Sequence, residues 1–74
     1  MLINLAITHK KDLKDPFLAD LIHTHEMQLK NGRLLVRYSG TEPVIRIMAE
    51  DADKDHAYTI AQALAHELKK YLIL

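Results

Sequence analysis

Apolar residues recur along this chain at two different spacings, and the order of those spacings limits the folds it can adopt. In four segments they alternate with polar residues, which is typical of strands that bury one face. The alternating segments are residues 2–8, 27–30, 33–38 and 44–50. Apolar residues follow helical spacing in two other segments. These are residues from about 16 to 25 and the stretch opened by residues 51–55. The chain therefore combines short strands with two amphipathic helices.

The order of these segments predicts an α+β fold with the element order β-α-β-β-β-α. Because each helix has a single apolar stripe, we expect both helices to pack on one face of a four-stranded antiparallel sheet. The stripe of the second helix consists of Ala57, Ile60, Ala61, Leu64, Leu68 and Tyr71. The chain has no repeat, low-complexity tract or linker, so residues 1–74 are predicted to form a single domain.

Local signals mark several element boundaries. Asp15 followed by Pro16 predicts a helix start, since Asp caps free amides and Pro suits the first helical position. Lys69 and Lys70 stand near the end of the second helix, where cations are favoured. Residues 31–32, Asn-Gly, predict a type I′ hairpin turn between two strands, because both residue types tolerate positive φ.

Composition excludes several classes of function. Ten basic and ten acidic residues give a net charge of zero, which disfavours nucleic-acid binding because that requires a surplus of cations. No apolar stretch is long enough to predict a membrane span. The chain contains no cysteine, so neither disulfides nor thiolate metal sites can stabilise it, and we expect a cytoplasmic protein.

The stretch RYSGTEPVIR, residues 37–46, is the strongest candidate for chemistry. Arginine binds phosphate well because its planar guanidinium donates two parallel hydrogen bonds. Glycine can take backbone angles that let amides converge on an anion, and the neighbouring hydroxyls can donate as well. Glu42 and Pro43 are expected to shape the loop's exit, since a residue before proline is restricted to extended conformations. The predicted phosphate-binding residues are Arg37, Ser39, Gly40, Thr41 and Arg46.

A plainer interpretation of this stretch is also open. Ser, Gly, Thr and Pro between strands often form only a tight turn. Strand arginines are often solvated, or paired with nearby carboxylates such as Glu42 and Glu50. From composition and spacing alone, the tight turn remains the commoner outcome.

The run GRLLVRYSGTEPVIRIMAE closely resembles the carboxy-terminal signature of the α-D-phosphohexomutases, and most of all that of the phosphoglucosamine mutases. This resemblance implies a four-domain enzyme in which a phosphoserine of the first domain exchanges a phosphoryl group with a sugar phosphate. Magnesium in the second domain supports the transfer, and a loop in the third recognises the sugar. The fourth domain, represented by this chain, would grip the phosphate that is not transferred. By resemblance, Arg37, Ser39, Gly40 and Thr41 make that grip, and Arg46 adds charge or holds the loop.

The family's serine loop, metal motif and sugar-recognition loop are all absent from these 74 residues. We therefore expect no catalytic residue, no metal site and no activity from the chain alone. Its five histidines are scattered over distant segments and do not predict a metal centre. Its expected partners are a sugar phosphate and the other domains of a mutase. The alternatives are a free-standing protein-interaction module and a domain of a phosphomannomutase or phosphoglucomutase; an RNA-binding domain is disfavoured by the neutral charge.

Overall fold

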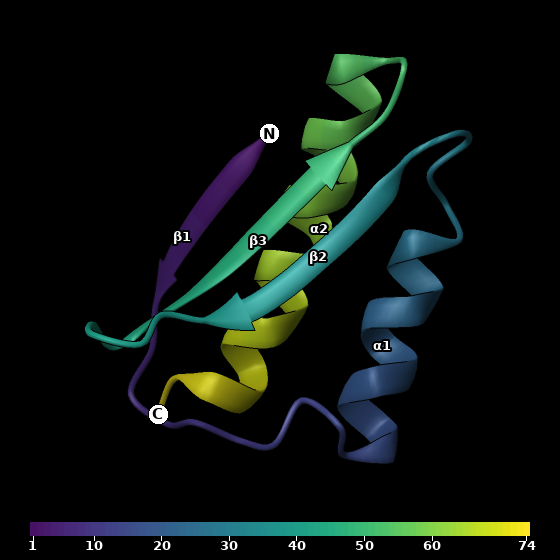
Figure 1. Cartoon of the computed structure of the whole chain (residues 1–74). Coiled ribbons are helices and arrows are strands. Elements are labelled where there is room, and N and C mark those ends of the chain that lie inside the picture. The colour runs from purple at the N-terminus through teal and green to yellow at the C-terminus, as the bar shows by residue number, and fades with distance from the viewer.

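The computed structural model describes all 74 residues, which form three strands and two helices. In chain order these are β1 (Leu2–Ala6), α1 (Pro16–Glu26), β2 (Arg33–Tyr38), β3 (Val44–Glu50) and α2 (Lys54–Leu72). The strands form one antiparallel sheet in the order β1-β3-β2, with β3 in the centre (Figure 1). No helix is long and apolar enough to cross a membrane.

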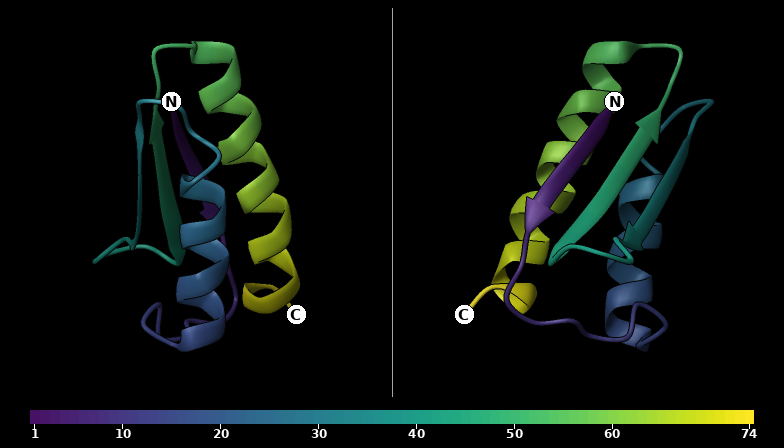
Figure 2. Two further views of the ribbon diagram at one scale, coloured as in Figure 1. Left: turned by 90° about the vertical axis from the view of Figure 1, so that its right-hand side faces the viewer. Right: turned by 60° about the vertical axis from the view of Figure 1, so that its left-hand side comes forward.

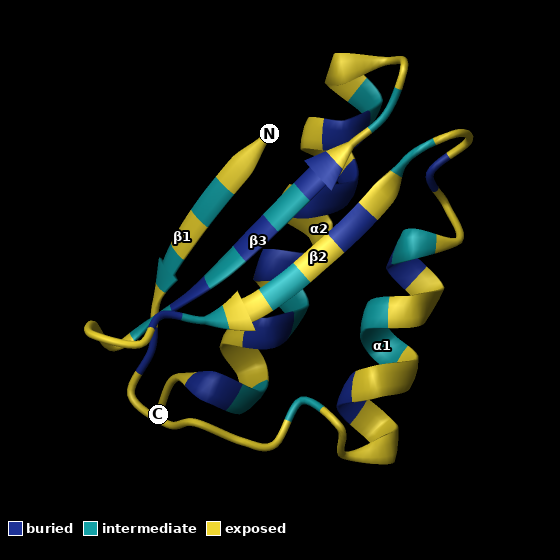
Figure 3. Ribbon diagram, viewed as in Figure 1, coloured by how far each residue is buried: buried dark blue, intermediate teal, exposed yellow.

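Both helices cover the same face of the sheet, as predicted, and the opposite face carries no covering element (Figure 2). The inward side chains of β3, Ile45, Ile47 and Ala49, are fully buried against α2. The apolar stripe of α2 is buried as well, apart from Tyr71 at its rim, and the buried residues follow its inner side (Figure 3). The predicted alternation of β2 and β3 is thus confirmed, because one parity of each strand faces the helices.

The predicted helix starts are also confirmed. The Oδ1 atom of Asp15 accepts a hydrogen bond from the amide of Phe17 at 3.0 Å, and Pro16 occupies the first turn. Asp53 caps α2 in the same way, its Oδ1 accepting from the amides of Asp55 and His56. Such caps satisfy amides that have no partner within the helix.

The predicted strand at residues 27–30 does not form, so the sheet has three strands and not four. The amides of Met27, Gln28 and Leu29 donate to the carbonyls of His23, His25 and Glu26, at 2.9, 3.1 and 3.0 Å. These bonds continue the turns of α1 and leave the segment unable to pair with a neighbouring strand. A four-residue alternation is too short to outweigh them.

The hairpin predicted at residues 31–32 is wrong for the same reason, since this segment joins α1 to β2. Neither Asn31 nor Gly32 has a positive φ. Gly32 is needed for a different purpose: a Cβ built on it would overlap the backbone carbonyl of Glu50 at the end of β3. The chain therefore requires glycine here because two backbones approach closely.

We expect Gly32→Ala to lower the free energy of unfolding by about 2 kcal/mol or more, because backbone must move to accept the methyl group. Gly40→Ala is the matched control. A Cβ at Gly40 meets no atom within 4 Å, and its φ is not positive, so its effect should stay within about 0.5 kcal/mol. Urea denaturation of both variants measures the difference, and equal stabilities would contradict the close approach.

The carboxylate of Asp51 accepts hydrogen bonds from the segment that precedes β2 and from the segment that precedes α2. Partial desolvation tends to raise the pKa of its carboxyl, but hydrogen bonds from the amides of Lys30, Ala52 and Asn31 and the nearby charge of His56 outweigh it and lower that pKa. A lowered pKa means that the folded state favours the carboxylate.

The stabilisation by Asp51 should therefore be complete above the ordinary carboxyl pKa of 3.8 and should be lost as the pH falls through the lower, folded value. Asp51→Asn should remove this part of the acid sensitivity. Thermal melts of both proteins between neutral and acid pH measure it. An identical pH dependence in the two proteins would show that Asp51 has no such role.

Candidate anion-binding site

The loop between β2 and β3 carries the predicted site residues to one end of the sheet. Arg37 in β2 and Arg46 in β3 are directly opposite each other in the antiparallel register. Both belong to the parity that faces away from the helices. Together with the loop they line an open recess of about 240 Å³. Its lining residues are Arg37, Tyr38, Ser39, Gly40, Thr41 and Arg46.

Every residue predicted to bind phosphate therefore lies on this recess. Glu42 and Pro43, predicted to shape the loop, are exposed beside it. The carbonyl of Pro43 accepts a hydrogen bond from the amide of Ile7 at 2.9 Å, which ties the loop's exit to the end of β1. The exit of the loop is thus held by the residue that follows β1.

The two arginines of the recess have no carboxylate partner. The only ion pairs in the molecule are Arg33–Glu50, at 3.5 Å, and Lys70–Glu67, at 3.0 Å. The Nε atom of Arg46 is buried and has no hydrogen-bond partner. Buried donors are nearly always satisfied, so this one marks a place where an acceptor would be stabilised. The alternative in which Glu42 or Glu50 neutralises these arginines does not occur.

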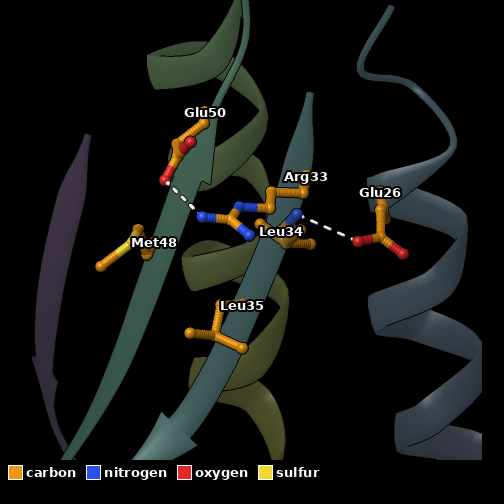
Figure 4. Close-up of a pocket in the computed structure, with 6 residues that line it drawn as sticks. All are labelled: Glu26, Arg33, Leu34, Leu35, Met48 and Glu50. Carbon is orange, nitrogen blue, oxygen red and sulfur yellow. Dashed lines mark hydrogen bonds and ion pairs between the residues drawn. The ribbon is translucent and has the colours of Figure 1, made fainter. Parts of the chain in front are cut away.

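A second hollow near the other end of β2 provides a contrast. It measures about 230 Å³ and is lined by Glu26, Arg33, Leu34, Leu35, Met48 and Glu50. There Arg33 points toward Glu50, and the carboxylate of Glu26 accepts from the amide of Leu34 at 3.0 Å (Figure 4). Because its one cation is paired and a second carboxylate lines it, this hollow does not suit an anion.

The buried side chain of Ser39 fixes the conformation of the loop through hydrogen bonds. Its Oγ accepts hydrogen bonds from the amides of Thr41 and Glu42, at 3.3 and 3.2 Å, and its own amide donates to Val44 at 3.0 Å. Ser39 is only 6% exposed. The amides of Thr41 and Glu42 therefore do not converge on an external anion, contrary to the expectation from sequence.

Gly40 also differs from the expectation, since its φ is not positive and the space around it is open. Its amide forms no hydrogen bond within the protein. The donors that remain for a bound anion are this amide, the two guanidinium groups and the hydroxyl of exposed Thr41. These groups suffice for a single phosphate, whose oxygens accept several charge-assisted hydrogen bonds.

The end of β2 makes a contact that the sequence patterns do not predict. The side chain of Tyr38 lies on the helix-facing side of β2, where its hydroxyl hydrogen-bonds the backbone of Lys11, at 2.6 and 2.9 Å. The side chain of Lys10 lies over the ring of Tyr38. No pattern in the sequence relates these residues, because the contact spans 27 positions of the chain.

No group of three or more His, Cys, Asp or Glu side chains converges to hold a metal. His25 is buried, with Nδ1 2.8 Å from the carbonyl of Leu21, whereas His23 is exposed. The Nε2 atom of His56 lies 2.7 Å from the carbonyl of Gln28. These contacts give two of the histidines structural roles.

Comparison with known proteins shows the family to which the chain belongs. Residues 2–67 match the family described as "Phosphoglucomutase/phosphomannomutase, C-terminal domain". The phosphoglucosamine mutase of Geobacter metallireducens is 44% identical over 72 residues, which cover 95% of this chain and 16% of that protein. That of Rhizobium meliloti is 43% identical over 67 residues, covering 89% of this chain and 15% of that protein. The chain thus spans about one sixth of the length of these relatives.

The fold also matches solved structures. The N-acetylphosphoglucosamine mutase of Aspergillus fumigatus superposes with a TM-score of 0.82 at 23% identity, over 100% of this chain and 16% of that one. A structure of the same enzyme with GlcNAc-6P and magnesium gives a TM-score of 0.78 at 24% identity, covering 95% of this chain and 15% of that one. The chain belongs to the phosphoglucomutase/phosphomannomutase family and is a C-terminal domain of the phosphohexomutase type, with phosphoglucosamine mutases among its relatives.

Proposed function

We propose that this domain grips the non-transferred phosphate of a sugar phosphate, most specifically glucosamine 6-phosphate or glucosamine 1-phosphate, within a four-domain phosphoglucosamine mutase. The observation that carries the proposal is the pair of adjacent arginines, Arg37 and Arg46, which line one recess without any carboxylate partner. Two like charges side by side on neighbouring strands are unfavourable by themselves. A bound dianion would attract both guanidinium groups and so offset their mutual repulsion.

The geometry favours recognition of phosphate over recognition of sugar. Most of the donors available at the recess are charged or backbone groups, from Arg37, Gly40 and Arg46, which suit a compact anion. A mutase must bind its substrate in two opposite orientations. A site that recognises only the phosphate group can bind the substrate in either orientation. Binding energy from a phosphate that does not react can orient the reacting end and promote domain closure, which excludes water.

The chemical step belongs to other domains in this proposal. Ser39 is no nucleophile in this proposal, since its Oγ accepts hydrogen bonds from the loop's amides and no His, Asp or Glu side chain hydrogen-bonds to it. Magnesium would support the transfer from another domain of the parent enzyme, and the Aspergillus fumigatus enzyme has been solved with magnesium bound. The protein as a whole would then be an isomerase that transfers a phosphoryl group within its substrate.

Two alternatives remain, and phosphate binding distinguishes one of them from the proposed function. A phosphomannomutase or phosphoglucomutase domain would bind phosphate in the same way, because the sugar is read elsewhere. A protein-interaction module would use the uncovered sheet face, where Leu2 and Leu35 are each 51% exposed. Such a module would not respond to phosphate at residues 37–46.

We expect inorganic phosphate and glucosamine 6-phosphate to shift the NMR signals of residues 37–46, with a dissociation constant roughly in the millimolar range because the other domains' contacts are missing. Arg37→Ala should cost about 1.5–3 kcal/mol, as for a lost charged hydrogen bond, and weaken binding roughly tenfold or more. A two-dimensional amide titration of both proteins gives the two constants.

Arg33→Ala is the matched control, because Arg33 lies on the same strand and face but is paired with Glu50. It should leave phosphate binding unchanged. Equal losses in the two variants would indicate diffuse charge attraction and not a site. An absence of shifts in the unmodified chain at high phosphate would remove the proposed function altogether.

A further inference from the structure

The two edges of the sheet differ in how their backbone groups are satisfied. β1 and β2 are the edge strands, since β3 lies between them. In an antiparallel pair, residues that exchange both backbone hydrogen bonds with the partner strand alternate with residues whose amide and carbonyl point away from it. One such exchanged pair therefore identifies every outward-pointing group of an edge strand.

The outer edge of β1 is open. Met1 and Ala49 exchange both backbone hydrogen bonds, at 3.0 and 2.9 Å, in the same register as β1 and β3. Because the pattern alternates, the amides and carbonyls of Leu2, Asn4 and Ala6 point away from β3. None of these groups has a hydrogen-bond partner, and no element lies beyond β1 on this side of the sheet (Figure 1).

The outer edge of β2 is partly closed. Leu34 points outward there, and the Oε2 atom of Glu26 accepts a hydrogen bond from its amide at 3.0 Å. Natural proteins protect edge strands with charged side chains, prolines or covering elements, since an open edge can pair with another strand. β1, with the sequence LINLA, contains no charged residue and no proline. It is therefore the edge that is open to strand addition.

The sequence of β1 suits pairing with a second copy of itself. Two β1 strands that meet antiparallel about a twofold axis at Asn4 place Asn4 opposite Asn4, and Leu2 opposite Ala6. All these residues point outward, so each opposed pair exchanges two backbone hydrogen bonds. A twofold axis perpendicular to the sheet also keeps the helices of both copies on one side, where Ile3 meets Leu5. No like charges are brought together, because β1 carries no charge.

We propose that two copies of this chain associate through the outer edges of β1, so that the strands of both copies form one continuous sheet. The assembly closes at two copies, because each has one open edge and uses it. Pairing of one short strand buries less surface than a standard interface, so we expect a weak dimer, with a dissociation constant on the order of 0.1–1 mM. The inference does not depend on the proposed phosphate site.

The first test is sedimentation equilibrium of the 74-residue chain at protein concentrations from well below to well above this range. The average mass should rise from that of one chain to that of two. Asn4→Lys should weaken the dimer about fivefold or more, because it places two like charges opposite each other at the axis. Asn31→Lys is the matched control: it adds the same charge at an exposed position outside the sheet and should leave the dimer unchanged.

The second test locates the interface by amide hydrogen exchange. The amides of Asn4 and Ala6 should exchange severalfold more slowly at high protein concentration than at low, because they gain acceptors only in the dimer. The amides of Val36 and Tyr38 provide the internal comparison. They point outward from β2 in the same alternation as Leu34 and should exchange at a rate that does not depend on concentration.

Each other result counts against the proposal. A mass that stays at one chain over the whole range excludes the dimer, and a mass that rises beyond two chains excludes its closure. Equal weakening by Asn4→Lys and Asn31→Lys would indicate general charge repulsion and not an interface at β1. Protection at Val36 and Tyr38 in place of Asn4 and Ala6 would move the interface to β2 and so overturn the assignment.

Discussion

The antiparallel register between β2 and β3 is the constraint on which the rest of the structure depends. It places Ile45 and Ile47 into the core on one face and sets Arg37 beside Arg46 on the other. Strand side chains alternate between faces, so a slip of one residue would drive arginines into the core and isoleucines into water. The apolar packing that stabilises the fold therefore also fixes the charged pair. No separate interaction is needed to hold the two guanidinium groups on one face.

The loop that joins these strands is stabilised by its own side chain rather than by a ligand. Ser39 is buried and its Oγ accepts from two amides, which fixes the turn without an anion. A loop that is already ordered loses little conformational entropy on binding. The consequence is a division of roles in which Ser39 shapes the recess and the arginines supply the attraction.

Much of this fold could be predicted from sequence because its signals are local. The cap at Asp15 and the alternation of β2 and β3 depend on residues only a few positions apart. The segment at residues 27–30 misled the prediction because its alternation competes with the continuing turns of α1, which the pattern cannot reveal. The sequence predicts a turn at Gly32 that does not form. Glycine is required there because the carbonyl of Glu50, distant in the sequence, leaves no room for a Cβ atom.

The candidate site shows the same limit. Residues 37–46 form one continuous stretch, so the sequence could bring them together before any fold was known. The contact between Tyr38 and Lys11 depends on the return of the β1–α1 connection to the same end of the sheet, which only the tertiary structure reveals.

The distribution of partnered charges explains how a chain of zero net charge can still attract an anion. Several carboxylates away from the recess are engaged in the fold: Glu50 pairs with Arg33, Glu26 accepts from a β2 amide, and Asp51 accepts from three amides. The cations at the loop have no such partners, and Glu42 is the one acid within the loop. Charge is thus balanced over the whole molecule and unbalanced at one end of the sheet. A local field of this kind can hold one phosphate while offering no extended surface to a polyanion, because binding a long phosphate backbone needs many cations in a row.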